Sequence, residues 1–268
     1  MSEADRQAAL GVAIGAARAA GAVLLDFSTR DLGVRHKGDV DLVSQADLAS
    51  ERVVRAHLAE AFPGDHVLGE EGGGATGAGG RRWIVDPLDG TTNFVHRLPH
   101  FNVSIALEVD GVVEVGVVFD PSRGELFEAT RGGGARLGGA PLRASPQTDL
   151  AEALVATGFP YDRKARIDVY LPFVRAFLLR AQGLRRAGAA ALDLAWLAAG
   201  RLDVYWEFQL KPWDVAAGAL LVTEAGGWVG GRGGRPHTLG DDLVIAAAPG
   251  LVAAVGDVFG GVDAQIGW

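Results

Sequence analysis

The first hydrophobic pattern along the chain is that of a long helix. Small and apolar residues recur through Glu3–Phe27, with charged residues only at intervals. Ser2 precedes this stretch and Asp5 follows three residues later, which matches a capping box with Asp in place of Glu. The pattern therefore predicts a helix over these residues, followed by a polar connector over Thr29–Asp41.

A second helical pattern begins near Ser44. Val54, Leu58 and Phe62 recur at four-residue spacing, which is typical of one buried helix face. Pro63-Gly64 then stops the pattern, because neither residue continues a helix readily. We expect a second helix between these limits.

The middle of the chain changes to apolar runs and two-residue alternation, which are typical of strands. Asp110-Gly111 lies between two such runs and is a strong signal for a two-residue hairpin turn. Pro87 is expected to end the first strand, because proline cannot donate to a sheet ladder. The predicted strands are Trp83–Asp86, Phe101–Val109, Val112–Phe119 and Glu125–Thr130.

Beyond roughly Ser145, strands and helices alternate. The predicted strands are Leu154–Ala156, Asp203–Phe208 and Leu243–Ala247, and the predicted helices are Ile167–Ala181, Ala189–Ala199 and Val215–Ala225, before a short closing helix. A meander flanked by helices and followed by alternating units predicts an α/β (α+β) chain of two layered halves. We place these halves at residues 1–145 and 146–268.

Composition removes several classes of protein. The 268 residues include no cysteine, which excludes disulfides, thiolate nucleophiles and Cys-ligated metal sites. The 33 acidic and 25 basic residues leave a net charge of −8, which argues against a nucleic-acid partner bound through the overall field. The first residues lack the features of a secretory signal, and uninterrupted apolar runs such as Ala187–Leu192 are far too short to span a bilayer. We therefore expect a cytoplasmic protein without a membrane partner.

Three segments place carboxylates where packing alone would not. Asp86 follows three apolar residues in a strand that should be buried, and Asp89 comes three residues later. A buried carboxylate is costly unless it is paired or bound to a cation. Glu70 follows an expected strand, and Asp214 would begin a helix. Oxygen ligands without cysteine or a close histidine favour Mg²⁺ or a similar ion.

Each segment also has a plainer explanation. Asp214 alone would be an ordinary helix cap, and Glu70-Glu71 alone would be a solvated pair. Asp47, expected in the first turn of the second helix, has a favourable helix-end charge as its alternative role. A cap explains neither the buried Asp86 nor the aspartate after it, so the three segments together favour a metal site.

Two other motifs of phosphate chemistry do not match this sequence. The Asp-x-x-Asp-Gly-Thr run differs from the Asp-x-Asp-Gly-Thr signature of aspartyl-nucleophile phosphatases by one residue and an intervening proline. The glycine clusters Gly72–Gly80 and Gly132–Gly139 lack the Gly-Lys-Ser/Thr ending of a phosphate-binding loop. Both clusters are therefore predicted to be ordinary loops.

The carboxylate segments resemble the inositol monophosphatase family, whose members are Mg²⁺-dependent and often lithium-inhibited phosphatases. The resemblance rests on Gly69-Glu70-Glu71, on the run from Trp83 to Phe94 and on Trp213–Gly218. It continues through Asp41–Asp47, Leu98–Phe101 and Arg185–Ala190, and so covers nearly the whole chain.

The resemblance implies an αβαβα layered sandwich with its site between the two halves, commonly as a homodimer. It also implies that Glu70, Asp86, Asp89 and Asp214, with the carbonyl of Leu88, hold two or three Mg²⁺ ions. Two or more divalent ions could hold both the attacking and the leaving oxygen of an in-line phosphoryl displacement. The first half would then carry most metal ligands, and the second half would carry Asp214 and the substrate contacts.

The resemblance further implies a metal-bound attacking water, oriented by Glu70 and by Thr91 with Asp47 behind it. A threonine hydroxyl is a poor base, so a carboxylate that accepts its proton would let its oxygen orient the water. Gly90, Thr91, Thr92 and nearby backbone amides would face the phosphate.

Substrate hydroxyls, by the same resemblance, would meet Glu207, Asp214 and the turn Gly188-Ala189-Ala190, with Arg185 near the substrate end. Many relatives carry Ser or Thr in place of Ala189, so a side-chain hydroxyl contact is absent there. Lys37 matches a lysine on a loop that approaches the metals in the family. A solvated surface lysine is an equally good interpretation of this residue.

The sequence therefore predicts a phosphomonoester hydrolase that acts on a small phosphorylated polyol or sugar. Glu207 and the Asp-Gly-Thr-Thr-Asn-Phe form favour myo-inositol 1-phosphate. Fructose 1,6-bisphosphate, histidinol phosphate, adenosine 3′,5′-bisphosphate and NADP remain alternatives, because related chains hydrolyse them. A non-catalytic role with transcription or ribosome-related machinery is the alternative from another class, although the full set of carboxylates favours catalysis.

Overall fold

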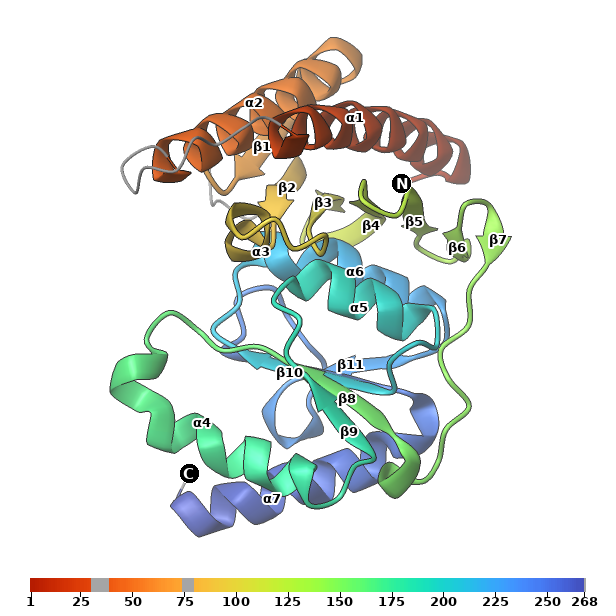
Figure 1. Ribbon diagram of the computed structural model, residues 1–268. Coiled ribbons are helices and arrows are strands. Elements are labelled where there is room, and N and C mark those ends of the chain that lie inside the picture. The colour runs from red at the N-terminus through yellow and green to blue at the C-terminus, as the bar shows by residue number, and fades with distance from the viewer. Residues whose placement is uncertain (30–38, 74–79, 268) are drawn as a thin grey trace.

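The computed structural model describes residues 1–29, 39–73 and 80–267, and for residues 39–44 it describes the backbone alone. Its longer helices are α1 (Glu3–Thr29), α2 (Asp39–Ala61), α4 (Arg163–Leu178), α5 (Ala190–Ala198), α6 (Pro212–Glu224) and α7 (Val252–Ile266). α1 and α2 cover a seven-stranded sheet, α5 and α6 lie between it and a five-stranded sheet, and α4 and α7 cover the far face (Figure 1). The αβαβα layering expected from the sequence is confirmed.

The first sheet follows the chain order. Its strands are β1 (His66–Gly69), β2 (Arg81–Asp89), β3 (Asn102–Val109), β4 (Val112–Asp120), β5 (Glu125–Thr130), β6 (Gly134–Leu137) and β7 (Ala140–Pro141). β1 lies parallel to β2, and the other neighbouring pairs are antiparallel. Because Gly69 is in register with Val85, the parallel pair brings Glu70 beside Asp86.

The second sheet has the order β11-β12-β10-β8-β9. Its strands are β8 (Leu154–Thr157), β9 (Gly183–Arg185), β10 (Val204–Phe208), β11 (Trp228–Gly230) and β12 (Leu243–Ala247). β8 is parallel to β9 and β10, whereas β12 is antiparallel to β10 and β11. The parallel pairing of β8 with β10 brings Gly158 and Glu207 to the same edge, where the glycine backbone lies against the carboxylate.

α1 is held by small residues on one face and by its predicted cap. Its buried residues are Ala9, Leu10, Ala13, Ala16, Ala17, Ala20, Gly21 and Leu24. The Asp5 amide donates to the Ser2 hydroxyl oxygen at 3.2 Å, and the Ser2 amide donates to the Asp5 carboxylate at 3.3 Å, which confirms the capping box. Among the described residues, α1 is the one helix long and apolar enough to cross a membrane by those two criteria alone. Of its most apolar window, 44% is buried inside the fold.

We expected the strand β2 to end at Pro87, and this boundary is wrong. The strand continues to Asp89, and the register against β3 shifts between Asp86 and Asp89, opposite Ser104 and Asn102. A proline is tolerated at such a bulge, because the ladder is already broken there. The extra residue shifts the alternation of side chains by one position. Asp86 and Asp89, which are three positions apart, can therefore point to the same face of the sheet.

The central helix α6 approaches the first sheet very closely at Gly116 of β4. A Cβ at this glycine would lie 2.9 Å from the carbonyl oxygen of Ala217 and 3.0 Å from its Cα. On its other side, a Cβ at Gly218 would lie 2.6 Å from the Cβ of Leu194 on α5. The first sheet and the two helices of the central layer are therefore packed without room for a methyl group at these positions.

Several expected boundaries are wrong. α2 begins at Asp39 rather than near Ser44, and the closing helix α7 has 15 residues and is not short. The cluster Gly132–Gly139 is not a simple loop, because it contains β6 between glycines with positive φ. The three-residue strands β9 and β11 were not predicted. Lys37, most of the connector after α1 and most of the cluster Gly72–Gly80 lie outside the described residues.

Candidate active site

A pocket of about 630 Å³ lies where the two halves meet, and most of the expected site residues line it. The expected residues that it brings together are Glu70, Asp86, Leu88, Asp89, Gly90, Thr91, Thr92, Gly188, Ala190, Glu207 and Asp214. Asp47, Arg185 and Ala189 do not line it. Arg186 lies in the wall in place of its neighbour Arg185, whose guanidinium donates to the carbonyl of Leu184 at 3.2 Å.

The bulge in β2 shapes the acidic floor of this pocket. Asp86 is 2% exposed, and its Oδ1 accepts the backbone N–H of Leu88 at 3.0 Å across the bend. The Ser50 hydroxyl on α2 donates to the Pro87 carbonyl at 2.8 Å, which holds the bend from the other side of the sheet. Asp86 is therefore held by a backbone contact within the bend, and the bend itself is held by Ser50.

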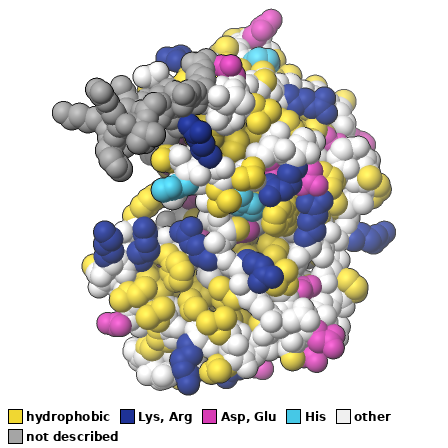
Figure 2. Space-filling model, viewed as in Figure 1, with side chains coloured by type: hydrophobic (Ala, Val, Ile, Leu, Met, Phe, Trp, Pro, Cys, Tyr) yellow, Lys and Arg dark blue, Asp and Glu magenta, His cyan; other side chains and the backbone are white. Residues whose placement is uncertain are grey.

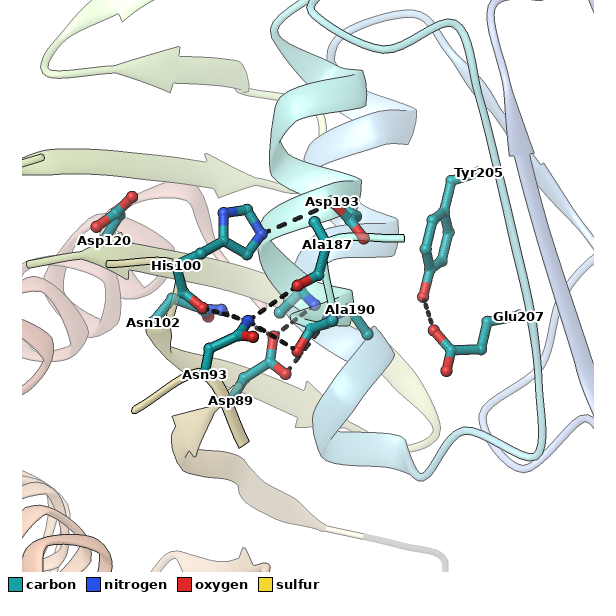
Figure 3. A network of polar contacts seen from close by, with 12 residues as sticks. Asp89, Asn93, His100, Asn102, Asp120, Ala187, Ala190, Asp193, Tyr205 and Glu207 are labelled. Atoms are coloured by element: carbon teal, nitrogen blue, oxygen red, sulfur yellow. Dashed lines mark hydrogen bonds and ion pairs between the residues drawn. The ribbon is translucent and has the colours of Figure 1, made fainter. Parts of the chain in front are cut away.

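Asp89 joins the two halves of the molecule (Figure 3). Its Oδ2 accepts from the Asn102 amide at 2.7 Å and from the Ala191 N–H at 2.8 Å, and its Oδ1 accepts from the Ala190 N–H at 3.3 Å. Ala190 and Ala191 form the first turn of α5, whose positive end favours an anion. The carboxylate of one half is thus seated on a helix of the other.

Gly90 and α3 (Thr91–Val95) make the turn that follows. Gly90 has φ 92°, and a Cβ there would lie 2.8 Å from the His100 carbonyl, so the position needs glycine. The Asn93 amide donates to the His100 carbonyl at 2.7 Å and to the Ala187 carbonyl at 2.9 Å (Figure 3). One side chain therefore ties this turn to the segment before α5.

Asp214 both caps a helix and lines the pocket. Its Oδ2 accepts the backbone N–H of Lys211 at 2.7 Å in the first turn of α6. The helix-cap explanation is therefore confirmed, and it is compatible with a second role, because the same side chain lies in the pocket wall.

Thr91 and Asp47 were expected to act as a pair. The Thr91 hydroxyl donates to the Leu88 carbonyl at 3.1 Å, and Asp47 is 4% exposed on α2, with an Oδ1 that accepts no hydrogen bond within the described part of the chain. Because α2 begins at Asp39, Asp47 lies in its third turn, and a helix-end charge cannot explain it. Burial, with Glu71 and Glu70 nearby, raises the pKa of Asp47 to about 8.

Burial and mutual repulsion also raise the pKa values of the pocket carboxylates. Burial, then Asp89 and Glu70, raises the pKa of Asp86 well above its usual range. Burial and Asp89 do the same to the pKa of Asp214. Burial, with Glu71 and Asp89, raises the pKa of Glu70 to about 7. Near neutral pH such a cluster is stable only with shared protons or with cations among its oxygens.

The outer part of the pocket differs in character from its floor. Its apolar wall is formed by Phe159, Tyr161 and Trp213. Its basic residues are Arg163, Arg186 and Lys211. Basic side chains also form a band across the middle of the face shown in Figure 2. An acidic floor below a partly basic and aromatic entrance suits a ligand that is anionic at one end and presents hydroxyls or a ring at the other.

Glu207, on β10 of the second sheet, lines the pocket. The Tyr205 hydroxyl donates to its Oε2 at 2.7 Å (Figure 3), and burial raises the pKa of Glu207 to about 7 although this bond opposes the shift. A carboxyl group with this pKa exchanges its proton near neutral pH and can either accept from or donate to a substrate hydroxyl.

The donor set fits hard divalent cations, although it is not arranged as a finished cage. No group of three or more His, Asp or Glu side chains among the described residues has the geometry of a bound metal ion. Asp86, Asp89 and Asp214 instead accept hydrogen bonds from protein N–H groups. Four carboxylates with raised pKa values line this pocket, and oxygen donors of this kind suit a hard divalent cation.

Sequence reasoning missed Asn102, Asn93, Arg186 and Glu51. Asn102 follows an aromatic residue at the start of an apolar strand, where a buried amide needs a partner, and this was the one usable signal. Asn93 stood inside the motif without an assigned role. Glu51 and Arg186 sit in ordinary charged surroundings, so only the tertiary structure shows their contacts.

Comparison with known proteins agrees with this geometry. The inositol monophosphatase family profile matches residues 5–257. A Pseudomonas aeruginosa protein named Nus factor SuhB is 45% identical over 247 residues, which cover 90% of this chain and 91% of that protein. A Rhizobium meliloti protein named inositol-1-monophosphatase is 46% identical over 240 residues, which cover 88% and 90% respectively. An inositol monophosphatase structure from Anabaena (Nostoc) matches with a TM-score of 0.88 at 38% identity, covering 98% of this chain and 99% of its own. The chain therefore belongs to the inositol monophosphatase family.

Proposed function

We propose that the protein is a Mg²⁺-dependent phosphomonoester hydrolase that prefers a myo-inositol monophosphate. The observation that carries the proposal is the set of four carboxylates, Glu70, Asp86, Asp89 and Asp214, that line one pocket and whose pKa values are all raised, chiefly by burial. These groups, with the Leu88 carbonyl, would hold two or three Mg²⁺ ions. When bound, the ions would neutralise the phosphate and polarise it for in-line displacement.

The remaining catalytic roles belong to Thr91, Asp47 and Glu70. Thr91 would orient the attacking water through its hydroxyl oxygen. For this, its hydroxyl proton would have to turn from the Leu88 carbonyl, to which it is donated in the structure, toward the Asp47 carboxylate. A pKa of about 8 leaves Asp47 largely protonated in the metal-free protein, and cations in the pocket would lower that pKa and free the carboxylate to act as a base. Glu70 both binds a cation and orients the water.

Substrate binding would use both halves. Gly90, Thr92 and neighbouring N–H groups face the phosphate, whereas Glu207, Asp214 and the segment Gly188–Ala190 face the hydroxyls. We keep the assignment of Arg185 near the substrate end of the pocket, although Arg185 does not line the pocket itself. Its neighbour Arg186 lines the pocket wall. The pocket volume of about 630 Å³ accommodates a polyol phosphate with space to spare.

Relative kcat/KM values test the substrate. Phosphate release with Mg²⁺ would be compared for myo-inositol 1-phosphate, fructose 1,6-bisphosphate, histidinol phosphate, adenosine 3′,5′-bisphosphate and NADP. The highest kcat/KM is expected for the inositol ester. A tenfold preference for another ester would reassign the substrate, and no Mg²⁺-dependent release from any of them would overturn the enzyme assignment.

The family also suggests lithium inhibition, a homodimer and a cytoplasmic location. Li⁺ would inhibit by occupying a cation position after hydrolysis. A LiCl titration against a matched NaCl control tests this, and equal effects of the two salts would contradict it.

A second function is favoured by the relatives named Nus factor SuhB, at 45% identity over 90% of the chain. We propose a protein-mediated association with the transcription machinery beside catalysis, because the net charge of −8 disfavours direct RNA binding. Co-purification of RNA polymerase with wild-type protein and with Asp89→Asn would support a role separable from phosphatase activity. Absence of polymerase from both would contradict it.

A further inference from the structure

The turn that carries Glu70 is held from behind by a side chain that the proposed chemistry does not use. Glu51 lies on α2 and is 3% exposed. Its carboxylate accepts the backbone N–H of Glu71 at 3.1 Å and that of Gly72 at 3.0 and 3.1 Å. Both oxygens therefore face the two amides that follow Glu70. Hydrogen bonds to an ionised acceptor are among the stronger ones in proteins, so this contact fixes the turn firmly.

Arg55 completes the contact from one turn further along α2. Its Nε and Nη2 lie 2.6 Å from Glu51 Oε1 and balance the buried charge. The same guanidinium donates to the Val67 carbonyl at 3.3 Å and to the Gly73 carbonyl at 3.0 Å. Because these carbonyls lie on either side of the turn, the ion pair joins both of its ends to one helix.

The fit around Glu51 leaves no room for a methyl group. A Cβ at Gly69 would lie 2.3 Å from Glu51 Oε1, and a Cβ at Gly72 would lie 2.6 Å from the same atom. Glu70 stands between these glycines, and its own N–H donates to the Val85 carbonyl of β2 at 3.3 Å. The backbone of Glu70 is therefore fixed by β2 on one side and by Glu51 on the other.

We propose that Glu51, supported by Arg55, is the positioning residue for the Glu70 carboxylate. The inference rests on the proposed function, because it concerns one ligand of the proposed Mg²⁺ site. Glu51 does not line the pocket. It contacts the turn directly, and its charge also acts through space on Glu70 and Asp47. Loss of a group that orients a metal ligand typically costs roughly 10–100-fold in metal affinity or activity.

Glu51→Gln tests the proposal in the full-length protein. Glutamine keeps the size of the side chain, but its NH₂ group meets either the turn amides or the guanidinium as a second donor. Isothermal titration of the substrate-free protein with Mg²⁺ should show affinity weakened by roughly 10–100-fold. Hydrogen exchange at the Glu71 and Gly72 amides of the metal-free protein should become faster.

Glu108→Gln is the matched control. Glu108 is also 3% exposed and pairs with Arg82 at 2.8 Å, at the end of β3 opposite to Asn102. Both variants should lower the melting temperature, because both break a buried ion pair. Only Glu51→Gln should change the Mg²⁺ affinity. Unchanged affinity in Glu51→Gln, or equal weakening in the two variants, would overturn the proposal.

A double variant keeps the test valid if Glu51→Gln does not fold. Glu51→Gln with Arg55→Gln removes both charges together and leaves neither unpaired in the interior. The same loss of Mg²⁺ affinity is expected. A wild-type protein that binds no Mg²⁺ would overturn the proposed metal site, and this inference with it. Wild type and double variant that bind Mg²⁺ equally well would overturn the positioning role alone.

Discussion

The two halves of the molecule bury different kinds of side chain. Nearly all of the buried polar and charged side chains among the described residues precede residue 145, and Thr157 and Asp193 are those that follow it. Between the second sheet and α4 and α7, the interior is instead aromatic, with Tyr170, Phe173, Phe177, Trp206, Phe208 and Phe259 in one cluster. A polar interior is costly and an aromatic one is stabilising. The chain before residue 145 therefore buries most of the polar groups, whereas the space between the second sheet and α4 and α7 is filled by aromatic rings.

The largest expected effect is the loss of a pocket carboxylate. Asp89→Asn or Asp214→Asn should abolish phosphate release and largely preserve the fold, because each removes a negative ligand from the proposed Mg²⁺ site. Asp89→Asn should lose more stability of the two, since an amide would face the N–H groups of Ala190 and Ala191. Phosphate release and circular dichroism would be measured together. Near-full activity of Asp89→Asn with unchanged Mg²⁺ dependence would contradict the ligand assignment.

The second effect concerns the proposed water-orienting pair. Asp47→Asn and Thr91→Ala should each lower kcat by roughly 10²–10⁴-fold, the usual range for acid–base assistance. The double variant should be little worse than either single one, because groups that act as a unit are not additive. Asp47→Asn should not destabilise the metal-free protein, since asparagine removes a buried acid. A kcat within about twofold of wild type would remove Asp47 from the mechanism.

A substitution in the aromatic interior should lower the stability of the protein without changing its Mg²⁺ affinity. Phe173 is fully buried, with ring centroids 5.1 Å from Phe259 and 5.3 Å from Phe208. Phe173→Ala should cost about 3–5 kcal/mol of unfolding free energy, as truncations of buried aromatic residues do. Mg²⁺ affinity of the folded protein should stay at the wild-type value. Urea unfolding and calorimetric titration measure the two quantities, and a parallel loss of both would break the contrast between the halves.

The smallest expected effect is a dependence of stability on pH in the metal-free protein. Burial raises the pKa of Asp47 to about 8 and the pKa of Glu207 to about 7. Both groups favour the fold when protonated, so their contribution is complete below about pH 4 and is lost as the pH rises through 7 and 8. The urea midpoint should therefore fall from about pH 5 to pH 8, and less so in Asp47→Asn.

Added Mg²⁺ is the control for this pH effect. It should raise the melting temperature most at the higher pH, because it binds the ionised cluster of the folded state. A midpoint that rises with pH in metal-free protein would contradict the raised pKa values.

The two layered halves and the carboxylates of the pocket floor could be predicted from local patterns, whereas the αβαβα order of the layers followed from the resemblance to the family. Asp86 and Asp89 stand out as carboxylates in an apolar strand, and α6 begins where Asp214 was expected to start a helix. The extension of β2 past Pro87 could not be predicted, because a bulge depends on the register of the neighbouring strand. Glu51 could not be found either, because its partners lie 20 and 21 residues away and its helical surroundings resemble those of a surface residue. Long-range pairing decides both cases.

The close approach at Gly116 has a consequence for how the catalytic centre can change. Ala217, which lies against this glycine, is one helical turn from Asp214 on α6, whereas Glu70, Asp86 and Asp89 belong to the sheet beneath. A side chain at Gly116 would push α6 away from the sheet and so move Asp214 away from Asp86 and Asp89. It would also strain the hydrogen bond that the Ser104 hydroxyl donates to the Trp213 carbonyl at 3.2 Å. The distance between Asp214 and the other carboxylates of the proposed cation site therefore depends on the van der Waals contact between Gly116 and Ala217, which carries no charge and no hydrogen bond.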